Sequence, residues 1–332
     1  MTSPIFTDID YGREGRQVGF LHLPWSPHGD AWGSIPIPVA VIRNGEGPTV
    51  VLMGGNHGDE YEGPIVLGRL IRDLDPGRVR GRLIFLPAIN LPAVRAGARV
   101  SPVDGKNLNR CFPGDPQGSA TDQIAHYVDS VIFPMADVFM DLHSGGSSLD
   151  IMPSVMMQRP DDAGLRRRTL DAVLAFNAPL TVVMDTLGER RTSSAAALAR
   201  GLVVIGSELG SAGAVSLDGL AVCERGVRNV LHHVGVVPLD ASPERRPSRL
   251  MRIVGADSYV FAPADGLFEP FHPLGTRVEK GQPAGQVVFL DDPGRAPVVA
   301  HFRRSGFLFC RRAPGRVDRG NGVCVLLNEY EE

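Results

Sequence analysis

Between Pro48 and Val237 the chain alternates short apolar runs, rich in β-branched residues, with longer amphipathic stretches. Five of the runs are candidate strands, namely Thr49–Met53, Leu83–Pro87, Val138–Leu142, Leu180–Met184 and Leu202–Ile205. Five stretches between them have helical spacing, namely Pro64–Leu74, Thr121–Phe133, Asp161–Phe176, Ser193–Ala199 and Gly219–Val234. Strands that are apolar on both faces and alternate with helices are typical of a sheet covered on both sides. We therefore predict an α/β fold with a mostly parallel or mixed sheet, whose ligands bind beyond the carboxyl ends of the strands.

The segments on either side of this region have other patterns. Gly19–Pro24 and Ile35–Arg43 alternate in polarity around a Pro/Gly/Trp-rich turn, which predicts an antiparallel hairpin. Pro238–Arg249 is rich in charges and helix breakers, which indicates a linker, and Ile253–Leu327 has short β runs with frequent Gly/Pro turns. We expect three regions, which are an N-terminal hairpin region at 1–45, an α/β domain at 46–240 and a smaller all-β domain at 250–330.

Two turns of the C-terminal region resemble those of a known type of β domain. Ala262–Gly266 and Val278–Gln282 resemble turns of the barrel-sandwich domains that carry lipoyl or biotinyl groups. Those carriers present a modifiable lysine at a hairpin tip, and the candidate tip here, Leu290–Arg295, contains none. We therefore expect a barrel-sandwich-like module with a structural or dimer-forming role, so that a homodimer is one expected assembly.

Charge and cysteine content exclude several classes of protein. The 332 residues include 34 Lys+Arg and 37 Asp+Glu, whereas nucleic-acid binders concentrate positive charge to neutralise phosphates. No run approaches the roughly 18–20 apolar residues of a membrane helix, and the N-terminal residues do not resemble a secretory signal. The four cysteines are scattered, which fits a reduced protein better than a disulfide framework. We expect a cytoplasmic protein that binds neither nucleic acid nor membrane.

Polar side chains follow two of the candidate strands. The first strand leads into Gly-Gly-Asn-His57-Gly-Asp-Glu60, and the third ends at His143. The glycines allow a sharp turn, and residues three apart share a face on a first helical turn, so His57 and Glu60 can converge on one ion. Two histidines and a glutamate are a ligand set of catalytic zinc. We predict one Zn²⁺ per chain on these residues, with Asp141 as a candidate for orienting a ligand from outside.

The last candidate strand continues into Gly-Ser-Glu208-Leu-Gly210, and so delivers one carboxylate to the same edge of the sheet. A hydrolytic zinc site needs a base, and a carboxylate buried near a cation can take a proton from water and pass it to a leaving amine. The alternative is a carboxylate placed at a helix N-terminus, where the helix dipole favours it. We expect Glu208 to be the general base.

A loop after the second candidate strand carries two arginines, Arg99 and Arg110, among prolines and glycines. One guanidinium can hold a substrate carboxylate in bidentate fashion and another can stabilise an oxyanion, while Asn109 can add a directional hydrogen bond. The chain has only two lysines and therefore 32 arginines. A plain surface role is thus a serious alternative for Arg99 and a weaker one for the Asn109–Arg110 pair.

Together these segments resemble the succinylglutamate desuccinylase/aspartoacylase family, which is related to the zinc carboxypeptidases. Four segments carry the resemblance in matching order, namely Gly54-Gly-Asn-His57-Gly-Asp-Glu60, Asn107-Leu-Asn109-Arg110, Asp141-Leu-His143 and Glu208-Leu-Gly210. The resemblance implies a zinc-carboxypeptidase-like fold, zinc on the two histidines and Glu60, and Glu208 as base. It also implies that Asn109 and Arg110 grip the substrate α-carboxylate, while Arg99 or alternatively Arg95 polarises the scissile carbonyl.

Longer signatures point to one branch of that family. Gly58–Pro64, Ser101–Gly105, Asn107–Gly114 and His143–Asp150 are most similar to the N-acetyl-diaminobutyrate deacetylases of ectoine breakdown. The resemblance implies an amidohydrolase that removes an acyl group, acetyl above all, from a small N-acyl amino acid. The alternatives are an aspartoacylase or succinylglutamate desuccinylase activity, a metallocarboxypeptidase, and a binding or scaffold protein that kept the fold. A diaminobutyrate amine would need an acidic neighbour, for which the candidates are Glu62, Asp104 and Asp150.

Overall fold

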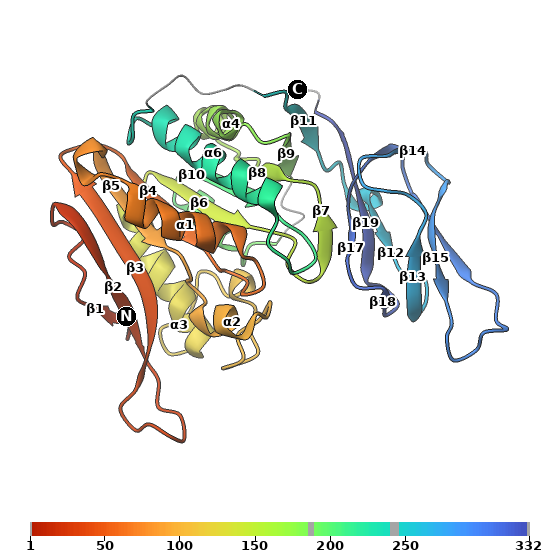
Figure 1. The fold of residues 1–332 in the computed structure, drawn as a ribbon, viewed down its shortest axis with the longest axis horizontal. Helices are drawn as coiled ribbons and strands as arrows, with labels where there is room; N and C mark the ends of the chain where they lie inside the picture. The colour runs from red at the N-terminus through yellow and green to blue at the C-terminus, as the bar shows by residue number, and fades with distance from the viewer. Residues whose placement is uncertain (1, 185–188, 240–245, 331–332) are drawn as a thin grey trace.

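The computed structural model describes residues 2–184, 189–239 and 246–330 (Figure 1). Its helices are α1 (Glu62–Asp73), α2 (Leu91–Ala96), α3 (Ala120–Tyr127), α4 (Ala163–Phe176), α5 (Ser193–Ala199) and α6 (Leu217–His233). The strands as far as the last helix are β1 (Phe6–Thr7), β2 (Gly15–Pro24), β3 (Ser34–Asn44), β4 (Thr49–Gly54), β5 (Gly81–Leu86), β6 (Val138–His143), β7 (Leu149–Ile151), β8 (Ser154–Gln158), β9 (Leu180–Met184) and β10 (Val203–Glu208). The later strands are β11 (Arg249–Arg252), β12 (Tyr259–Phe261), β13 (Gly266–Pro270), β14 (Arg277–Val278), β15 (Pro283–Val288), β16 (Val298–His301), β17 (Gly306–Arg312), β18 (Arg316–Val317) and β19 (Gly322–Glu329).

The larger sheet is mixed, and its strand order is β1-β2-β3-β5-β4-β6-β10-β8-β9-β11-β19-β17-β14. Strands β5, β4, β6 and β10 run parallel, so their carboxyl ends meet at one edge. Strand β8 pairs antiparallel with β10, with Gly206 opposite Met156, and parallel with β9. Strands β8 and β9 therefore run opposite to the four parallel strands β5, β4, β6 and β10.

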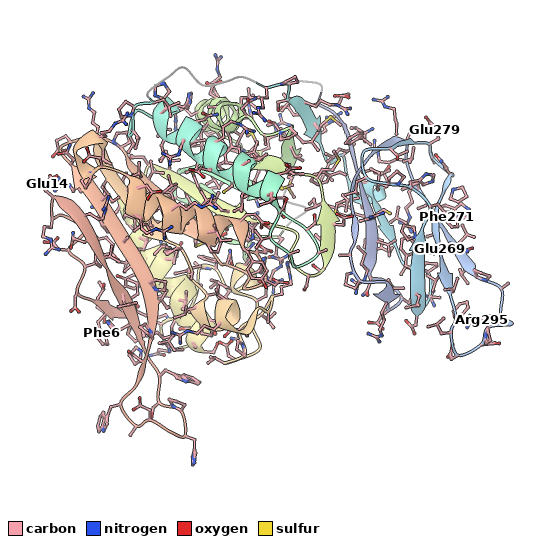
Figure 2. All side chains as sticks on the ribbon, viewed as in Figure 1. Phe6, Glu14, Glu269, Phe271, Glu279 and Arg295 are labelled. Carbon is pink, nitrogen blue, oxygen red and sulfur yellow. The ribbon has the colours of Figure 1, made fainter. Side chains whose placement is uncertain are left out.

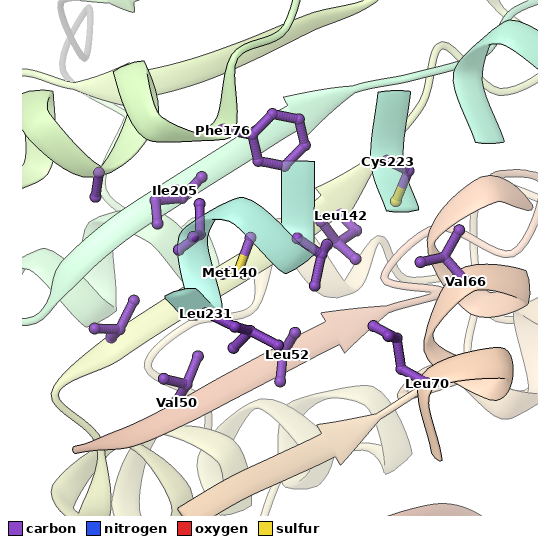
Figure 3. Close-up of a cluster of buried hydrophobic side chains, with 14 of the residues drawn as sticks. Val50, Leu52, Val66, Leu70, Met140, Leu142, Phe176, Ile205, Cys223 and Leu231 are labelled. Carbon is purple, nitrogen blue, oxygen red and sulfur yellow. The ribbon is translucent and has the colours of Figure 1, made fainter. Parts of the chain in front are cut away.

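Helices cover both faces of this sheet. On one face α1, α4 and α6 bury Leu70, Phe176 and Leu231 against strand residues such as Leu52 (Figure 3). On the other face, α5 packs against β6 and β10, and α3 contributes Ile124 and Ala125 to the same buried cluster. The close contact of α4 with α6 depends on Gly226, because a Cβ there would lie 2.2 Å from a ring carbon of Phe176. The core on both faces thus holds the strand ends in place.

The C-terminal β region is joined to the larger sheet through shared strands. Strand β11 pairs with β9, β19 pairs with β11, and β17 pairs with both β19 and β7. A separate four-stranded antiparallel sheet has the order β16-β15-β13-β18. Phe6 and Glu14 lie at one end of the molecule, and Glu269, Phe271 and Arg295 lie at the other (Figure 2). The loop containing Arg295 is the candidate carrier tip, where the guanidinium stacks on Phe289 at 3.6 Å.

All five predicted strands and the predicted hairpin are present, and four of the five predicted helices are regular α-helices. The fifth, Thr121–Phe133, is α-helical only to Tyr127 and continues as a π turn at Val128–Ile132. Sequence patterns missed α2, β7 and β8. Of the predicted linker Pro238–Arg249, residues 240–245 lie outside the described residues, and Arg249 already belongs to β11. No helix in the described ranges is long and apolar enough to cross a membrane.

Candidate metal and substrate site

The loop after β4 positions the first two candidate ligands. Gly55 has a positive φ of 67°, and Gly58 approaches α2 so closely that a Cβ would lie 1.9 Å from the carbonyl carbon of Ala93. The Gly58 amide also donates to the Ala98 carbonyl at 2.9 Å. Glycine is required at this contact, and the tight turn buries both His57 and Glu60, each of which is 3% exposed.

The third candidate ligand comes from the neighbouring strand. His143 is the last residue of β6, and its Nδ1 lies 2.8 Å from Oε2 of Glu60. The Nδ1 atom of His57 lies 2.6 Å from the other oxygen, Oε1. The amide of Ser144 donates to Oε2 at 3.1 Å. One ligand atom from each of His57, Glu60 and His143 lies within 4.8 Å of the others, so the three residues can share a metal ion.

The outer nitrogens of both histidines face oxygen atoms. His57 Nε2 lies 3.2 Å from Oδ1 of Asn107, and His143 Nε2 lies 3.0 Å from Oδ2 of Asp141, closer than the amide of Asn109 at 3.4 Å. A proton on each Nε2 satisfies these contacts and leaves the Nδ1 lone pairs aimed at Glu60. Two lone pairs and a carboxylate repel one another unless a cation lies between them. The donor set therefore fits a metal ion.

The charges of the cluster also act strongly on one another. Although burial alone would lower it, the carboxylates of Asp141 and Glu60 raise the pKa of His143 well above its usual value. Burial opposes ionisation of Glu60 as well, but His143 and His57 hold the pKa of that carboxyl far below its usual value. The cluster thus stabilises positive charge next to an ionised Glu60.

Glu208 is the last residue of β10 and lies opposite His143 in the parallel register. Its Oε2 atom is enclosed and has no hydrogen-bond partner in the parts of the chain that the structure describes. Burial, together with the nearby Glu60 carboxylate, raises the pKa of Glu208 to about 8. A carboxyl group with such a pKa can exchange a proton near neutral pH.

A cavity of about 250 Å³ brings the predicted site residues together. It is lined by all seven of them, namely His57, Glu60, Arg99, Asn109, Arg110, His143 and Glu208. The structure thus places near the metal ligands the loop residues that lie between the first two ligand segments in the sequence.

The two arginines differ in their contacts. Arg99 lies near the ligands, with Nη1 3.6 Å from Oε1 of Glu60, whereas its alternative Arg95 is an exposed residue of α2. Arg110 donates through Nη1 to the carbonyl of Asn109 at 2.6 Å, and its Nε lies 3.6 Å from Glu189. Both guanidinium groups are partly exposed and can therefore turn toward a ligand.

Asn109 is held in place by Ser193, the first residue of the short helix α5. Its Oδ1 accepts a hydrogen bond from the amide of Ser193 at 2.9 Å, where α5 begins, and lies 3.1 Å from the Ser193 hydroxyl oxygen. The Ser193 hydroxyl also donates to Oδ2 of Asp141 at 2.5 Å. The start of α5 therefore holds Asn109 and Asp141 in place at the same time.

The three acidic candidates for reading a side-chain amine all have partners within the protein. Glu62 is buried and accepts from the Ser144 hydroxyl at 2.5 Å, and Asp150 pairs with Arg311 at 2.8 Å. Asp104 accepts from the hydroxyls of Ser119 and Thr121. Among the described residues that line the cavity, none of the three acids is present.

Sequence reasoning also missed one wall of the cavity. Met156 and Gln158 of β8 and Met184 of β9 line it beside β10. The run Ser-Val-Met-Met-Gln lies between Pro153 and Pro160, and its apolar centre was the only available signal for a strand. Asn107, which contacts His57, was quoted in a motif without a role of its own.

Comparisons with known proteins extend over the whole chain. The family model described as the succinylglutamate desuccinylase/aspartoacylase catalytic domain matches residues 46–234. Over 329 residues the chain is 42% identical to the N-alpha-acetyl-L-2,4-diaminobutyric acid deacetylase of Halomonas elongata, which covers 99% of this chain and 96% of that protein.

Solved structures agree with this likeness. A crystal structure of a succinylglutamate desuccinylase/aspartoacylase from Rhodobacter sphaeroides has a TM-score of 0.93 and 45% identity, covering 99% of this chain and 100% of that one. The product-bound structure of the ectoine utilization protein EutE (DoeB) from Ruegeria pomeroyi has a TM-score of 0.95 and 40% identity, covering 98% and 99% of the two chains. The mixed α/β sheet with flanking helices and an additional antiparallel sheet is thus a shared fold.

Proposed function

Since this chain belongs to the succinylglutamate desuccinylase/aspartoacylase family of amide hydrolases, we propose that it removes the acetyl group of Nα-acetyl-2,4-diaminobutyrate. The observation that carries the proposal is the single cavity shared by a metal-binding triad, an enclosed carboxyl group and two arginines. The near full-length identity to a diaminobutyric acid deacetylase supports this choice of substrate.

We propose one Zn²⁺ per chain, held by Nδ1 of His57, the carboxylate of Glu60 and Nδ1 of His143. Support comes from the two nitrogen donors and one carboxylate, and from the acceptors on the outer nitrogen of each histidine. When bound, zinc supplies Lewis-acid polarisation of the amide carbonyl and of water.

Glu208 acts as the proton carrier of the hydrolysis. Its carboxylate takes a proton from the attacking water as the new C–O bond forms at the acetyl carbon. The carboxyl group then gives that proton to the departing amine nitrogen as the C–N bond breaks, which releases acetate. Its place in the cavity beside the three metal ligands gives it access both to the attacking water and to the departing amine.

The loop residues orient the substrate. Arg110 binds the α-carboxylate, for which it gives up a contact of 3.6 Å with Glu189 that is too long for a strong hydrogen bond. Asn109 adds a hydrogen bond from an amide that Ser193 has already oriented. Arg99 points its charge at the acetyl carbonyl oxygen, where negative charge develops in the transition state.

The size and charge of the cavity favour this reaction over two relatives. A volume of about 250 Å³ suits one acyl amino acid better than an extended peptide, which favours a deacylase over a carboxypeptidase. Arg99 and Arg110 are the only arginine or lysine side chains among the described lining residues, and both have roles already. The side-chain carboxylate of N-acetyl-aspartate would therefore have no cationic partner in the cavity, which argues against an aspartoacylase.

We also propose that the regions divide the work. Residues 46–240 form the catalytic domain, on which the hairpin region 1–45 packs. Residues 250–330 form a barrel-sandwich-like domain that narrows the cavity, since β17 pairs with β7 and Leu149 of β7 is a lining residue.

Glu208→Gln tests the mechanism. The variant should bind one equivalent of zinc by elemental analysis and lose about 10²–10⁴ in kcat on Nα-acetyl-diaminobutyrate, the usual range for a general base. Glu46→Gln is a matched control, because Glu46 is 99% exposed and remote in the fold. Normal turnover by Glu208→Gln would remove the proposed base, and exclusive hydrolysis of N-acetyl-aspartate by the wild type would remove the proposed substrate.

A further inference from the structure

The cavity extends away from the metal ligands along two strands that run in opposite directions. Glu208, Gly206 and Val204 are alternate residues of β10 and therefore share one face of the sheet. Met156 lies opposite Gly206 in the register, and Gln158 is two residues further along β8 on the same face. The direction from Glu208 toward Gln158 is therefore a path that leads from the reacting groups into the cavity.

The middle of this path is open and its walls are flexible and apolar. A Cβ at Gly206 would meet nothing closer than the Met156 carbonyl oxygen at 3.6 Å, so the space above Gly206 belongs to the cavity. Met156 and Met184 flank it, and thioether side chains adapt well to unbranched aliphatic chains. A short methylene chain suits this segment.

The far end of the path presents a hydrogen-bond acceptor without a donor. Oε1 of Gln158 is enclosed, and within residues 2–184, 189–239 and 246–330 no group donates to it. An enclosed acceptor that lacks a partner carries a free-energy penalty, which a ligand with an N–H group can remove. The acidic candidates for binding a side-chain amine, Glu62, Asp104 and Asp150, all have partners elsewhere in the protein.

We propose that Gln158 determines specificity by accepting a hydrogen bond from the terminal ammonium group of the substrate side chain. The two methylene groups of that side chain lie over Gly206 between the methionines. This assignment rests on the proposed deacylase function and names the group that reads the side chain within the same site. It selects acyl amino acids with a short, unbranched, amine-bearing side chain.

The test compares two substrates that differ in one group. Nα-acetyl-diaminobutyrate ends in an ammonium group, and N-acetyl-norvaline carries a methyl group in its place. Gln158→Leu should lower kcat/KM for the first about 10- to 100-fold, mainly through KM, and leave the second nearly unchanged. Gln158→Glu should restore the preference for the amine. Gln286→Leu is a matched control on β15, where Gln286 contacts Glu269 in an exposed position.

A second variant uses the open segment of the path. Gly206→Ala meets only ordinary contacts within the protein, so it should keep activity on N-acetyl-alanine and lose activity on both longer substrates. Equal losses for the amine and methyl substrates in Gln158→Leu would overturn the assignment. A second result would also overturn it. If Gln158→Leu keeps the wild-type ratio of kcat/KM for the amine substrate to that for the methyl substrate, and Glu189→Gln loses this ratio, the amine is recognised beside Arg110 instead. A zinc-loaded wild type that hydrolyses neither compound would instead refute the deacylase function itself.

Discussion

Gly58→Ala should abolish the metal site without touching a ligand. The added Cβ would lie 1.9 Å from the Ala93 carbonyl carbon and 2.0 Å from its oxygen, whereas real Cβ contacts stay above 3.0 Å. The loop must therefore retreat by about 1 Å, because α2 presents rigid backbone there. Metal–ligand distances tolerate only about 0.2 Å. His57 and Glu60, on either side of Gly58, should no longer share an ion with His143.

The assay combines zinc content, turnover and thermal unfolding. We expect well under one zinc per chain, a loss of at least about 100-fold in kcat/KM, and a destabilisation of about 1–3 kcal/mol. Gly68→Ala is the matched control within α1, where the nearest atom to a new Cβ is the flexible Arg72 guanidinium at 3.6 Å. That variant should gain about 0.5–1 kcal/mol and keep its zinc. A Gly58→Ala protein with full zinc content and turnover would refute the reasoning.

Three further perturbations follow from particular contacts. Asp141→Asn removes the carboxylate behind His143 and should weaken zinc affinity about 10- to 100-fold in a chelator competition; unchanged affinity would contradict the role. Gly226→Ala places a Cβ 2.2 Å from the Phe176 ring and should cost about 1–3 kcal/mol by denaturant unfolding, and wild-type stability would show that α4 and α6 can separate freely. Burial raises the Glu208 pKa from 4.5 to about 8, so the free energy of unfolding of the metal-free protein should fall by up to about 5 kcal/mol as pH rises between those values. Metal-free Glu208→Gln should lack that pH dependence, and parallel stability curves would contradict the shift.

Local patterns predicted the parts of the fold that have a strong periodicity. The strands of the parallel core are apolar on both faces, and four long amphipathic stretches could be recognised as helices. Strand β8 could not be recognised in this way, because five residues between two prolines carry little periodicity. Its direction is set by pairing with β10 and β9, which are distant in the chain. Only three-dimensional pairing reveals the reversal.

The candidate site shows a similar division. Residues at the carboxyl ends of strands, such as His143 and Glu208, could be predicted because parallel strands bring these ends together. The hydrogen-bond partners of side chains could not be predicted from the sequence. Glu62, for example, has the right charge for an amine but already accepts a hydrogen bond from Ser144. Gln158 carries no motif, and its role depends on an acceptor that the fold encloses without a donor.

The change of strand direction between β10 and β8 separates hydrolysis from substrate choice, two properties that evolution can alter independently. The groups proposed for hydrolysis come from β4, β6, β10 and the loops at their carboxyl ends, while β8 enters the cavity from the opposite direction and contributes none of them. Exchanging residues along β8 can therefore retune which acyl amino acid is accepted while the hydrolytic apparatus stays intact. Substitutions within the five residues of β8 can in this way adapt one scaffold to different acyl amino acids.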